Sequence, residues 1–342
     1  MAIADILFDP GVLGATGSVC ELQGFGVAAA RDGAAVLPWR GDWLRAQAAG
    51  VDAFADVTEL GERLFDQCVV HLQKSRPGTW RDLADGWQRL EPGGRLLLIG
   101  GNDLGIKSAV KRLGRELGDP GEVLANRAHG RVVRFIKRDG PSPTRPELAP
   151  VDLVGEDSSR LALQTHPGVF SADRLDAGTA LLLDCLADVE APTRIFDAGC
   201  GIGPLGIAAL RRWPEAHGLL ADADARAVAC AAANADKAGV AARCDVRWWE
   251  ATEPVPVAAC ELALVNPPFH YQSHKSVDLA GAHALFRAVA TALAPGGVAL
   301  VVANRSLPYE EPLSAFGAIR NVVTREGFKV IEVRRSAAGA SG

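Results

Sequence analysis

The sequence predicts an α/β protein built from two tandem units, and three observations support this. Short runs rich in Leu, Val and Ile alternate with helical stretches rich in Ala, Leu and Arg, which is typical of a parallel sheet covered by helices. Four prolines among polar residues mark 139–150 as a linker between residues 1–138 and 151–342. Finally, LEPGGRLLLIG at 90–100 resembles LAPGGVALVVA at 293–303, which indicates two copies of one unit.

The elements of the second half follow in order from this alternation. Each apolar run of five to seven residues predicts a buried strand, and each longer Ala-rich stretch predicts a helix. The expected strands are 194–198, 217–221, 243–248, 261–265, 297–303 and 328–334, and the expected helices are 173–188, 204–213, 224–238 and 279–294.

Composition narrows the class of protein. The chain has 342 residues, 48% of them hydrophobic, and a net charge of −5, which suits a globular protein of about two domains. No run approaches the ~20 apolar residues of a membrane helix, and the N-terminus lacks an export signal. Seven scattered cysteines without a CxxC pair indicate reduced thiols. We therefore expect a cytoplasmic monomer with neither a membrane anchor nor a metal site.

A glycine-rich turn over 197–206, DAGCGIGPLG, follows an apolar strand and leads into a helix. Gly199, Gly201 and Gly203 allow a ligand to approach the backbone closely. The pattern fits a dinucleotide, but with Asp197 at the strand end it also fits S-adenosylmethionine. Asp222, at the end of the next strand, can accept the ribose hydroxyls of either ligand. The first half has no glycine-rich turn of this kind, which predicts one working site and one silent copy.

The tetrapeptide Asn266-Pro267-Pro268-Phe269 favours S-adenosylmethionine over a dinucleotide. It follows strand 261–265, at the carboxyl edge of a parallel sheet, where open α/β folds bind ligands. The Asn266 side-chain oxygen and the Pro267 carbonyl can accept both hydrogens of a planar amine, and a base can stack on Phe269. Pro268 and His270 are expected beside the substrate.

These motifs resemble class I methyltransferases that modify exocyclic or amide nitrogens. HPGVFSADRLDAGTALLL at 166–183, NPPFH at 266–270 and VVANRSLPY at 301–309 are similar to the bacterial 16S rRNA guanine-N2 methyltransferase C family. The resemblance implies two tandem Rossmann-like, class I methyltransferase domains, the N-terminal one degenerate and binding RNA. It also implies S-adenosylmethionine as cofactor and the N2 of a guanine in small-subunit rRNA as substrate.

The same resemblance implies roles for further residues. Asp197 and the three glycines would line the methionine end of the cofactor, Asp222 would hold its ribose, and Glu250 would lie near the adenine. Phe170, Arg174 and Asp176 would cover the mouth of the site.

A local excess of positive charge predicts where RNA binds. Residues 101–140 contain nine Lys/Arg and five Asp/Glu, a local charge of +4. Such an excess is typical either of an ordinary solvated face or of a surface that binds a polyanion. The candidate phosphate contacts are Lys107, Lys111, Arg112 and Arg131.

Other activities remain open at this point. NPP-aromatic motifs also occur in 23S rRNA guanine-N2, adenine-N6 and protein glutamine-N5 methyltransferases. The glycine turn also suits an NAD-dependent oxidoreductase. A non-catalytic RNA-binding assembly factor is the alternative from a different class.

Overall fold

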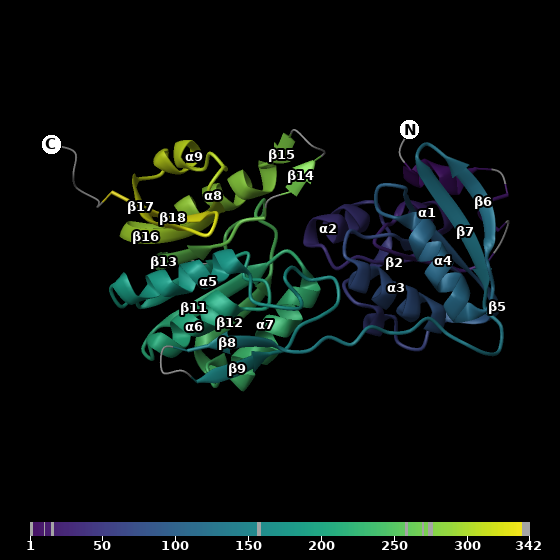
Figure 1. The fold of residues 1–342 in the computed structure, drawn as a ribbon, viewed down its shortest axis with the longest axis horizontal. Coiled ribbons are helices and arrows are strands. Elements are labelled where there is room, and N and C mark those ends of the chain that lie inside the picture. Colours follow the sequence, from purple (N-terminus) through teal and green to yellow (C-terminus); the bar gives the residue numbers. More distant parts are fainter. Residues whose placement is uncertain are drawn as a thin grey trace. The chain divides into compact units, whose positions relative to one another are not determined.

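The protein divides into two compact units, Met1–Leu148 and Ala149–Gly342 (Figure 1). The structure is a computed structural model, and it describes residues 3–9, 11–14, 17–155, 159–256, 259–268, 270–272 and 276–336. At 270–272 and 276–278 only the backbone is described. The division between the units falls inside the proline-rich segment 139–150, which contains no helix or strand. No helix in the described ranges is long and apolar enough to cross a membrane.

The first unit is a seven-stranded sheet with helices on both faces. Its strands are β1 (Val19–Leu22), β2 (Ala34–Val36), β3 (Asp52–Phe54), β4 (Phe65–His71), β5 (Leu90–Gly101), β6 (Glu122–Arg127) and β7 (Gly130–Ile136). Its helices are η1 (Ile3–Phe8), α1 (Gly26–Arg31), α2 (Arg40–Ala48), η2 (Val57–Leu60), α3 (Arg76–Gln88) and α4 (Ile106–Leu117).

The second unit repeats this plan and adds two hairpins. The sheet strands are β10 (Arg194–Ala198), β11 (His217–Asp222), β12 (Cys244–Trp248), β13 (Cys260–Val265), β16 (Leu293–Asn304), β17 (Ala318–Arg325) and β18 (Phe328–Arg334). The helices are α5 (Ala177–Asp184), η3 (Cys185–Asp188), α6 (Pro204–Arg212), α7 (Ala225–Lys237), η4 (Ala241–Arg243), α8 (Ala280–Ala292) and α9 (Glu310–Ser314). The hairpins are β8 (Val151–Val154) with β9 (Arg160–Leu163), and β14 (His270–Gln272) with β15 (Ser276–Asp278).

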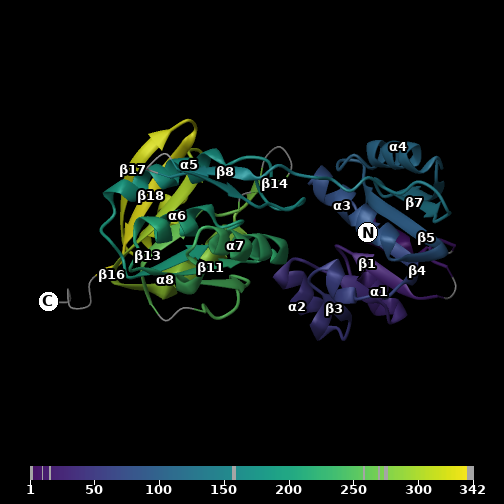
Figure 2. The same ribbon diagram turned by 90° about the horizontal axis from the view of Figure 1, so that it is seen from below.

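The two sheets have the same strand order, β3-β2-β1-β4-β5-β7-β6 and β12-β11-β10-β13-β16-β18-β17. In each sheet the first five strands pair in parallel. The sixth strand in this order, β7 or β18, pairs antiparallel with both of its neighbours. Figure 2 shows the antiparallel pair β17 and β18 side by side. Two tandem copies of one α/β unit are what the sequence predicts, and this expectation is confirmed.

Alternating strand residues build the core of the second unit on both faces of its sheet. Leu262 and Leu264 of β13 pack with α5, α6 and α7, whereas Ala263 and Val265 pack with α8 and α9 (Figure 1). A strand buried on both faces requires a continuous apolar run, and this explains why β10, β11 and β13 were recognisable in the sequence. The sheet thereby holds the carboxyl ends of these strands, where the candidate site lies, at one edge.

One helix begins later than expected, and the difference concerns the site. The sequence predicts a helix over 173–188, but α5 begins at Ala177 because Asp176 is its N-cap, with ψ 139° and a side chain that accepts the Thr179 N–H at 2.9 Å. Residues 164–176, which we call the covering segment, therefore have no regular structure.

Candidate functional site

The glycine turn, residues 199–203, connects β10 to α6. Gly199, Gly201 and Gly203 have φ of 79°, 56° and 90°, a region that side chains with a Cβ rarely adopt. A Cβ added to Gly201 would meet no atom within 4 Å, so this glycine borders open space. The N–H groups of Gly199 and Cys200 donate to the Ala221 carbonyl, which ties the turn to the end of β11.

Asp197 lies beneath this turn and is fully buried. Its Oδ2 accepts the backbone N–H of Gly206 at 2.8 Å, while its Oδ1 is buried and has no hydrogen-bond partner in the described structure. Burial raises the pKa of Asp197 to about 7; the Gly206 hydrogen bond opposes the shift and the Asp222 carboxylate adds to it. A group that donates to this carboxylate would relieve the cost of its burial.

Asp222, at the end of β11, holds the glycine turn from the neighbouring strand. Its Oδ2 accepts the N–H of Gly201 and its Oδ1 accepts the N–H of Asp224, each at 2.8 Å. Burial raises the pKa of Asp222 to about 6. Each carboxylate oxygen retains a second lone pair, so this side chain can accept further hydrogen bonds.

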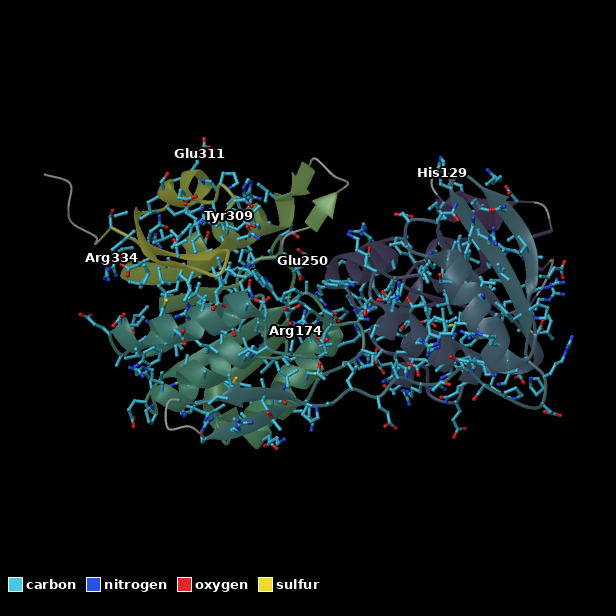
Figure 3. The ribbon with its side chains drawn as sticks, in the orientation of Figure 1. His129, Arg174, Glu250, Tyr309, Glu311 and Arg334 are labelled. Atoms are coloured by element: carbon cyan, nitrogen blue, oxygen red, sulfur yellow. The ribbon has the colours of Figure 1, made fainter. Side chains whose placement is uncertain are left out.

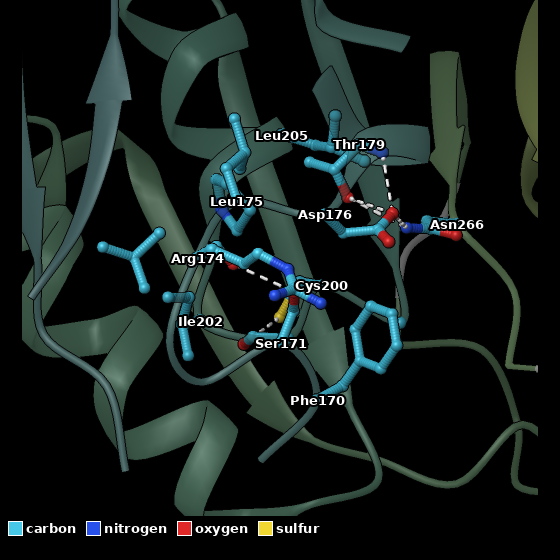
Figure 4. Close-up of a pocket in the computed structure, with 14 residues that line it drawn as sticks. Phe170, Ser171, Arg174, Leu175, Asp176, Thr179, Cys200, Ile202, Leu205 and Asn266 are labelled. Atoms are coloured by element: carbon cyan, nitrogen blue, oxygen red, sulfur yellow. Dashed lines mark hydrogen bonds between the residues drawn. The ribbon is translucent and has the colours of Figure 1, made fainter. Parts of the chain in front are cut away.

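Asn266 follows β13 and faces the covering segment across the turn. Its Nδ2 donates to Asp176 Oδ2 at 3.0 Å and to Thr179 Oγ1 at 2.9 Å (Figure 4). Both amide hydrogens are therefore bound, and Oδ1 is left as the acceptor. Of the two prolines that follow, Pro267 is buried and Pro268 is exposed.

A pocket of about 450 Å³ that opens to solvent lies between the glycine turn and the covering segment. The glycine turn, the start of α6, the covering segment and Asn266 form its walls. The lining residues are Val151, Phe170, Ser171, Arg174, Leu175, Asp176, Thr179, Gly199, Cys200, Gly201, Ile202, Pro204, Leu205 and Asn266. Phe170 stands at this pocket with 64% of its surface exposed, the largest exposed fraction among the large apolar side chains of the described residues.

Some predicted residues lie outside the pocket or outside the described residues. The described residues that line the pocket do not include Asp197, Gly203, Asp222 or Glu250. Glu250 follows β12 (Figure 3), and its backbone N–H donates to Glu253. Phe269 lies outside the described residues. His270 belongs to β14, where the side chain is not described.

Thr179 is a site residue that the sequence analysis did not select. It is 5% exposed and bonded to Asn266, and it belongs to the quoted segment HPGVFSADRLDAGT. Asn234 of α7 was also missed. Fully buried, it accepts the Gln164 N–H and donates to the Gln164 and Ile202 carbonyls, thereby joining the covering segment to the glycine turn.

The predicted phosphate contacts differ in how their charges are used. Lys107 and Lys111 are exposed along α4, and Arg115, one further turn along, is exposed with them. Arg112 instead donates to Glu116 at 2.8 Å and stacks on Trp80 with its guanidinium 3.9 Å from the ring centroid. Lys107, Lys111 and Arg115 therefore form a basic row at i, i+4 and i+8 on one side of the helix.

The fourth predicted phosphate contact, Arg131, is on β7 and half-buried. It lies two residues before Val133, so it shares the strand face that packs against α4. Its Nε is buried without a hydrogen-bond partner among the described residues.

Strand register identifies the counterparts of the site in the first unit. When the two Pro-Gly-Gly turns are aligned, β4 pairs with β5 as β13 pairs with β16, so Val70 and Val265 are equivalent. The next residue is His71 in the first unit and Asn266 in the second. The first unit thus has an imidazole where the second unit has an amide.

The same register crosses the neighbouring strands. It places Glu21 at the position of Asp197 and Leu37 at the position of Asp222. Leu37 is buried and apolar, so it cannot accept a hydrogen bond from a ligand hydroxyl.

In the first unit a shorter turn at 23–25, which contains one glycine, joins β1 to α1, so the first half has a strand–turn–helix connection but not a glycine-rich one. Glu21 Oε2 accepts the N–H groups of Val27 and Ala28 at 2.7 and 2.9 Å, as Asp197 accepts that of Gly206. Its Oε1 lies 2.7 Å from His71 Nε2, and a Cβ on Gly24 would lie 2.4 Å from that nitrogen. The His71 side chain thus packs against the turn.

The fold and the site define a class I methyltransferase. Over residues 160–332 the chain matches the family described as methyltransferase small domain, and it belongs to that family. The fold is similar to that of a T. thermophilus 16S rRNA guanine-N2 methyltransferase solved with AdoMet and guanosine. The TM-score is 0.81 at 22% identity, over 94% of this chain and 89% of that one.

The chain belongs, more narrowly, to the ribosomal RNA small subunit methyltransferase C family. It is 32% identical over 284 residues to that protein from Hahella chejuensis, covering 82% of this chain and 81% of the relative. It is also 38% identical over 202 residues to ribosomal RNA large subunit methyltransferase G from Streptomyces avermitilis, covering 58% of this chain and 50% of that one. The family resemblance seen in the sequence is confirmed, and so is the expectation of a methyltransferase enzyme.

Proposed function

We propose that the second unit transfers a methyl group from S-adenosylmethionine to the exocyclic N2 of a guanine in small-subunit rRNA. The observation that carries this proposal is the amide of Asn266, which presents an oxygen acceptor at the rim of the pocket beside the glycine turn. An acceptor in that place suits a nucleophile that carries N–H groups. The names of the relatives and of the structural neighbour point to the same reaction.

The residues around the glycine turn fit the cofactor. Gly201 borders open space that a Cβ would enter, and the buried Oδ1 of Asp197 lacks a partner among the described groups. We assign Asp197, Gly199, Gly201 and Gly203 to the methionine end, where a cationic ammonium suits a buried carboxylate. Asp222 accepts the ribose hydroxyls. When bound, the cofactor supplies a methyl group on a positively charged sulfur.

Asn266 and Pro267 orient the guanine amine. The amine is a weak nucleophile because its lone pair is delocalised into the ring. Asn266 Oδ1 and the Pro267 carbonyl accept its two hydrogens, and these hydrogen bonds direct the lone pair. The bonds become stronger as the nitrogen becomes positive in the transition state. Phe269 provides a face for the flipped base, and Pro268 and His270 flank it. Phe170, exposed at the pocket, covers the bound ligands, and Glu250 stays our candidate for the adenine end.

We propose that the first unit has lost cofactor binding and holds RNA. Lys107, Lys111 and Arg115 place three exposed cations along one helix, and Arg131 adds a fourth on the adjoining strand face. Phosphate contacts of this kind supply affinity without base specificity. Since Arg112 is bonded to Glu116, it contributes less than its lysine neighbours. We expect the enzyme to act as a monomer in the cytoplasm.

A second candidate substrate is a guanine of large-subunit rRNA. The match to a large-subunit methyltransferase over 202 residues favours it. The two candidate substrates are distinguished by two parallel reactions. Each contains the enzyme and labelled cofactor, one with undermethylated small ribosomal subunits and the other with undermethylated large ribosomal subunits. Label in the small subunit, mapped to guanine N2, supports the proposal, whereas label confined to the large subunit contradicts it.

Replacing Asn266 by Ala tests the role of the amide. We expect turnover to fall by about 10²–10³, the usual scale for removing one positioned polar group, while cofactor affinity stays unchanged. The measurement is single-turnover methyl transfer under saturating cofactor, with calorimetry of cofactor binding. Wild-type turnover in the Asn266→Ala variant would show that the amide has no part in the reaction.

A further inference from the structure

We propose that Asp176 and Thr179 are positioning residues that lock the Asn266 amide with its oxygen toward the amine of the substrate. This inference rests on the proposed function and explains how the acceptor is held in one orientation. An amide that turned by 180° about its terminal bond would present two donors instead. It would then bind a carbonyl oxygen and repel the N–H groups of an amine.

The chemistry of the partners determines the orientation. A carboxylate can only accept, so the Asn266 atom 3.0 Å from Asp176 Oδ2 must be the nitrogen. The second amide hydrogen goes to Thr179 Oγ1 at 2.9 Å. In Figure 4 both dashed lines from Asn266 start at its nitrogen, and its oxygen points away from Asp176 and Thr179.

The same contacts hold the partners themselves in place. Asp176 Oδ2 also accepts the Thr179 N–H at 2.9 Å and lies 3.5 Å from the Thr179 hydroxyl, which can donate to it. The hydroxyl therefore keeps a lone pair directed at Asn266. Thr179 is nearly fully buried in the first turn of α5, so its side chain has little freedom to choose another partner. Asp176 thus caps α5 and also orients the Asn266 side chain in the loop after β13.

Thr179→Val removes the hydroxyl and preserves the shape of the side chain. We expect turnover to fall at least 10-fold, because Asn266 loses one of the two contacts that direct its amide, with KM for the cofactor unchanged. Thr179→Ser keeps the hydroxyl and should retain most of the activity. The matched control is Thr79→Val in α3, which loses a buried hydroxyl that accepts the Gln73 N–H and donates to the Ser75 carbonyl. It should lower thermal stability and leave turnover unchanged.

An exchange of the two side chains tests the pairing itself. Asn266→Asp alone sets two carboxylates against each other and should be poorly active, although a carboxylate can accept. Adding Asp176→Asn restores a donor facing an acceptor and still permits an N-cap, so the double variant should recover at least 5-fold over Asn266→Asp. If the double variant recovers nothing and Thr179→Val turns over at the wild-type rate, the proposal is wrong.

A readout independent of methyl transfer separates this inference from the proposed function. The side-chain NH₂ signals of Asn266 in a ¹H–¹⁵N correlation NMR spectrum are identified because they disappear in the Asn266→Asp variant. In the wild type these hydrogens should exchange slowly with solvent because both are bonded, and Thr179→Val should accelerate the exchange. Fast exchange in the wild type overturns the positioning role even in an active enzyme. Slow exchange in a protein that methylates neither subunit leaves the positioning intact and refutes the proposed function.

Discussion

Two carboxylates beside the glycine turn, Asp197 and Asp222, are held in an environment that opposes their ionisation. Burial raises their pKa values to about 7 and about 6, from a usual value of 3.8. Their hydrogen bonds come from the backbone of the turn and the adjoining helices, so ionisation is only partly compensated. A bound ammonium or hydroxyl would favour the charged forms. Ionisation of these two buried carboxylates therefore costs stability, which a donor bound to them would offset.

Asp197→Asn should change how stability depends on pH. The folded protein keeps a proton on Asp197 up to about pH 7, whereas the unfolded chain loses it near 3.8. This group therefore contributes stability that is complete below about pH 4 and is lost as pH rises through 7, with an upper limit of about 4 kcal/mol. In urea unfolding at pH 5 and pH 8, the wild type should lose more stability than Asp197→Asn. The comparison at pH 5 controls for any packing change, and parallel losses would contradict the shifted pKa.

For single residues, the sequence predicted which side chains belong to the candidate site but not how those side chains are oriented. Asn266 was recognisable because it follows a buried strand and precedes two prolines. Its amide direction was not, because the two atoms that determine it belong to residues 90 and 87 positions earlier in the chain. Similarly, Arg112 resembled its basic neighbours in the sequence, but Glu116 and Trp80 engage it in the fold.

Among the elements, burial decided which ones the sequence could reveal. The expected strands 194–198 and 328–334 match β10 and β18 to the residue, because their apolar side chains pack into the cores. The edge strand β17 escaped prediction because its residues are exposed or half-buried and its apolar residues do not form a continuous run. The β8–β9 hairpin was missed as well, since its four-residue strands give too short a pattern.

The basic row on α4, Lys107, Lys111 and Arg115, should contribute to RNA affinity through contacts with phosphates. In the double variant Lys107→Ala/Lys111→Ala, the slope of log affinity against log salt should decrease in magnitude by about 1.5, because two fewer counterions are released. The measurement is filter binding of rRNA between 50 and 300 mM salt, where about 50 mM is low enough to show phosphate contacts. Methyl transfer at saturating RNA should be unchanged.

The matched control is Arg127→Ala/Arg134→Ala, which removes the same charge from the same segment. Those arginines are already paired, with Asp9 and Glu122 respectively. Their loss should alter the salt slope much less. Equal slopes for the two double variants would mean that α4 is an ordinary solvated face.

At the scale of the whole molecule, the two units share one topology, and we propose that they have different roles. Both units keep the strand order and a buried acid beneath the strand–helix turn, Glu21 or Asp197, because that acid accepts the first N–H groups of a helix. The units differ at positions that correspond to the candidate site. Leu37 replaces an acceptor, and His71 fills the space beside Gly24. The acid at the end of β1 and β10 therefore has a structural role in both units, and we propose that ligand binding was lost with the acceptor at the end of β2.

This separation predicts one cofactor site per chain. Calorimetry with the intact protein should give a stoichiometry of one for S-adenosylmethionine, and Asp222→Ala should weaken binding by roughly 1.5–3 kcal/mol, the scale for hydrogen bonds to a charged group. Glu21→Gln provides the control in the other unit: it can still cap α1 through its oxygen, so it should leave affinity and stoichiometry unchanged. Two sites per chain, or an affinity loss in Glu21→Gln equal to that in Asp222→Ala, would show that the first unit still binds. Because Leu37 offers no acceptor where Asp222 offers two oxygens, we expect a single site, in the second unit, whose affinity depends on Asp222.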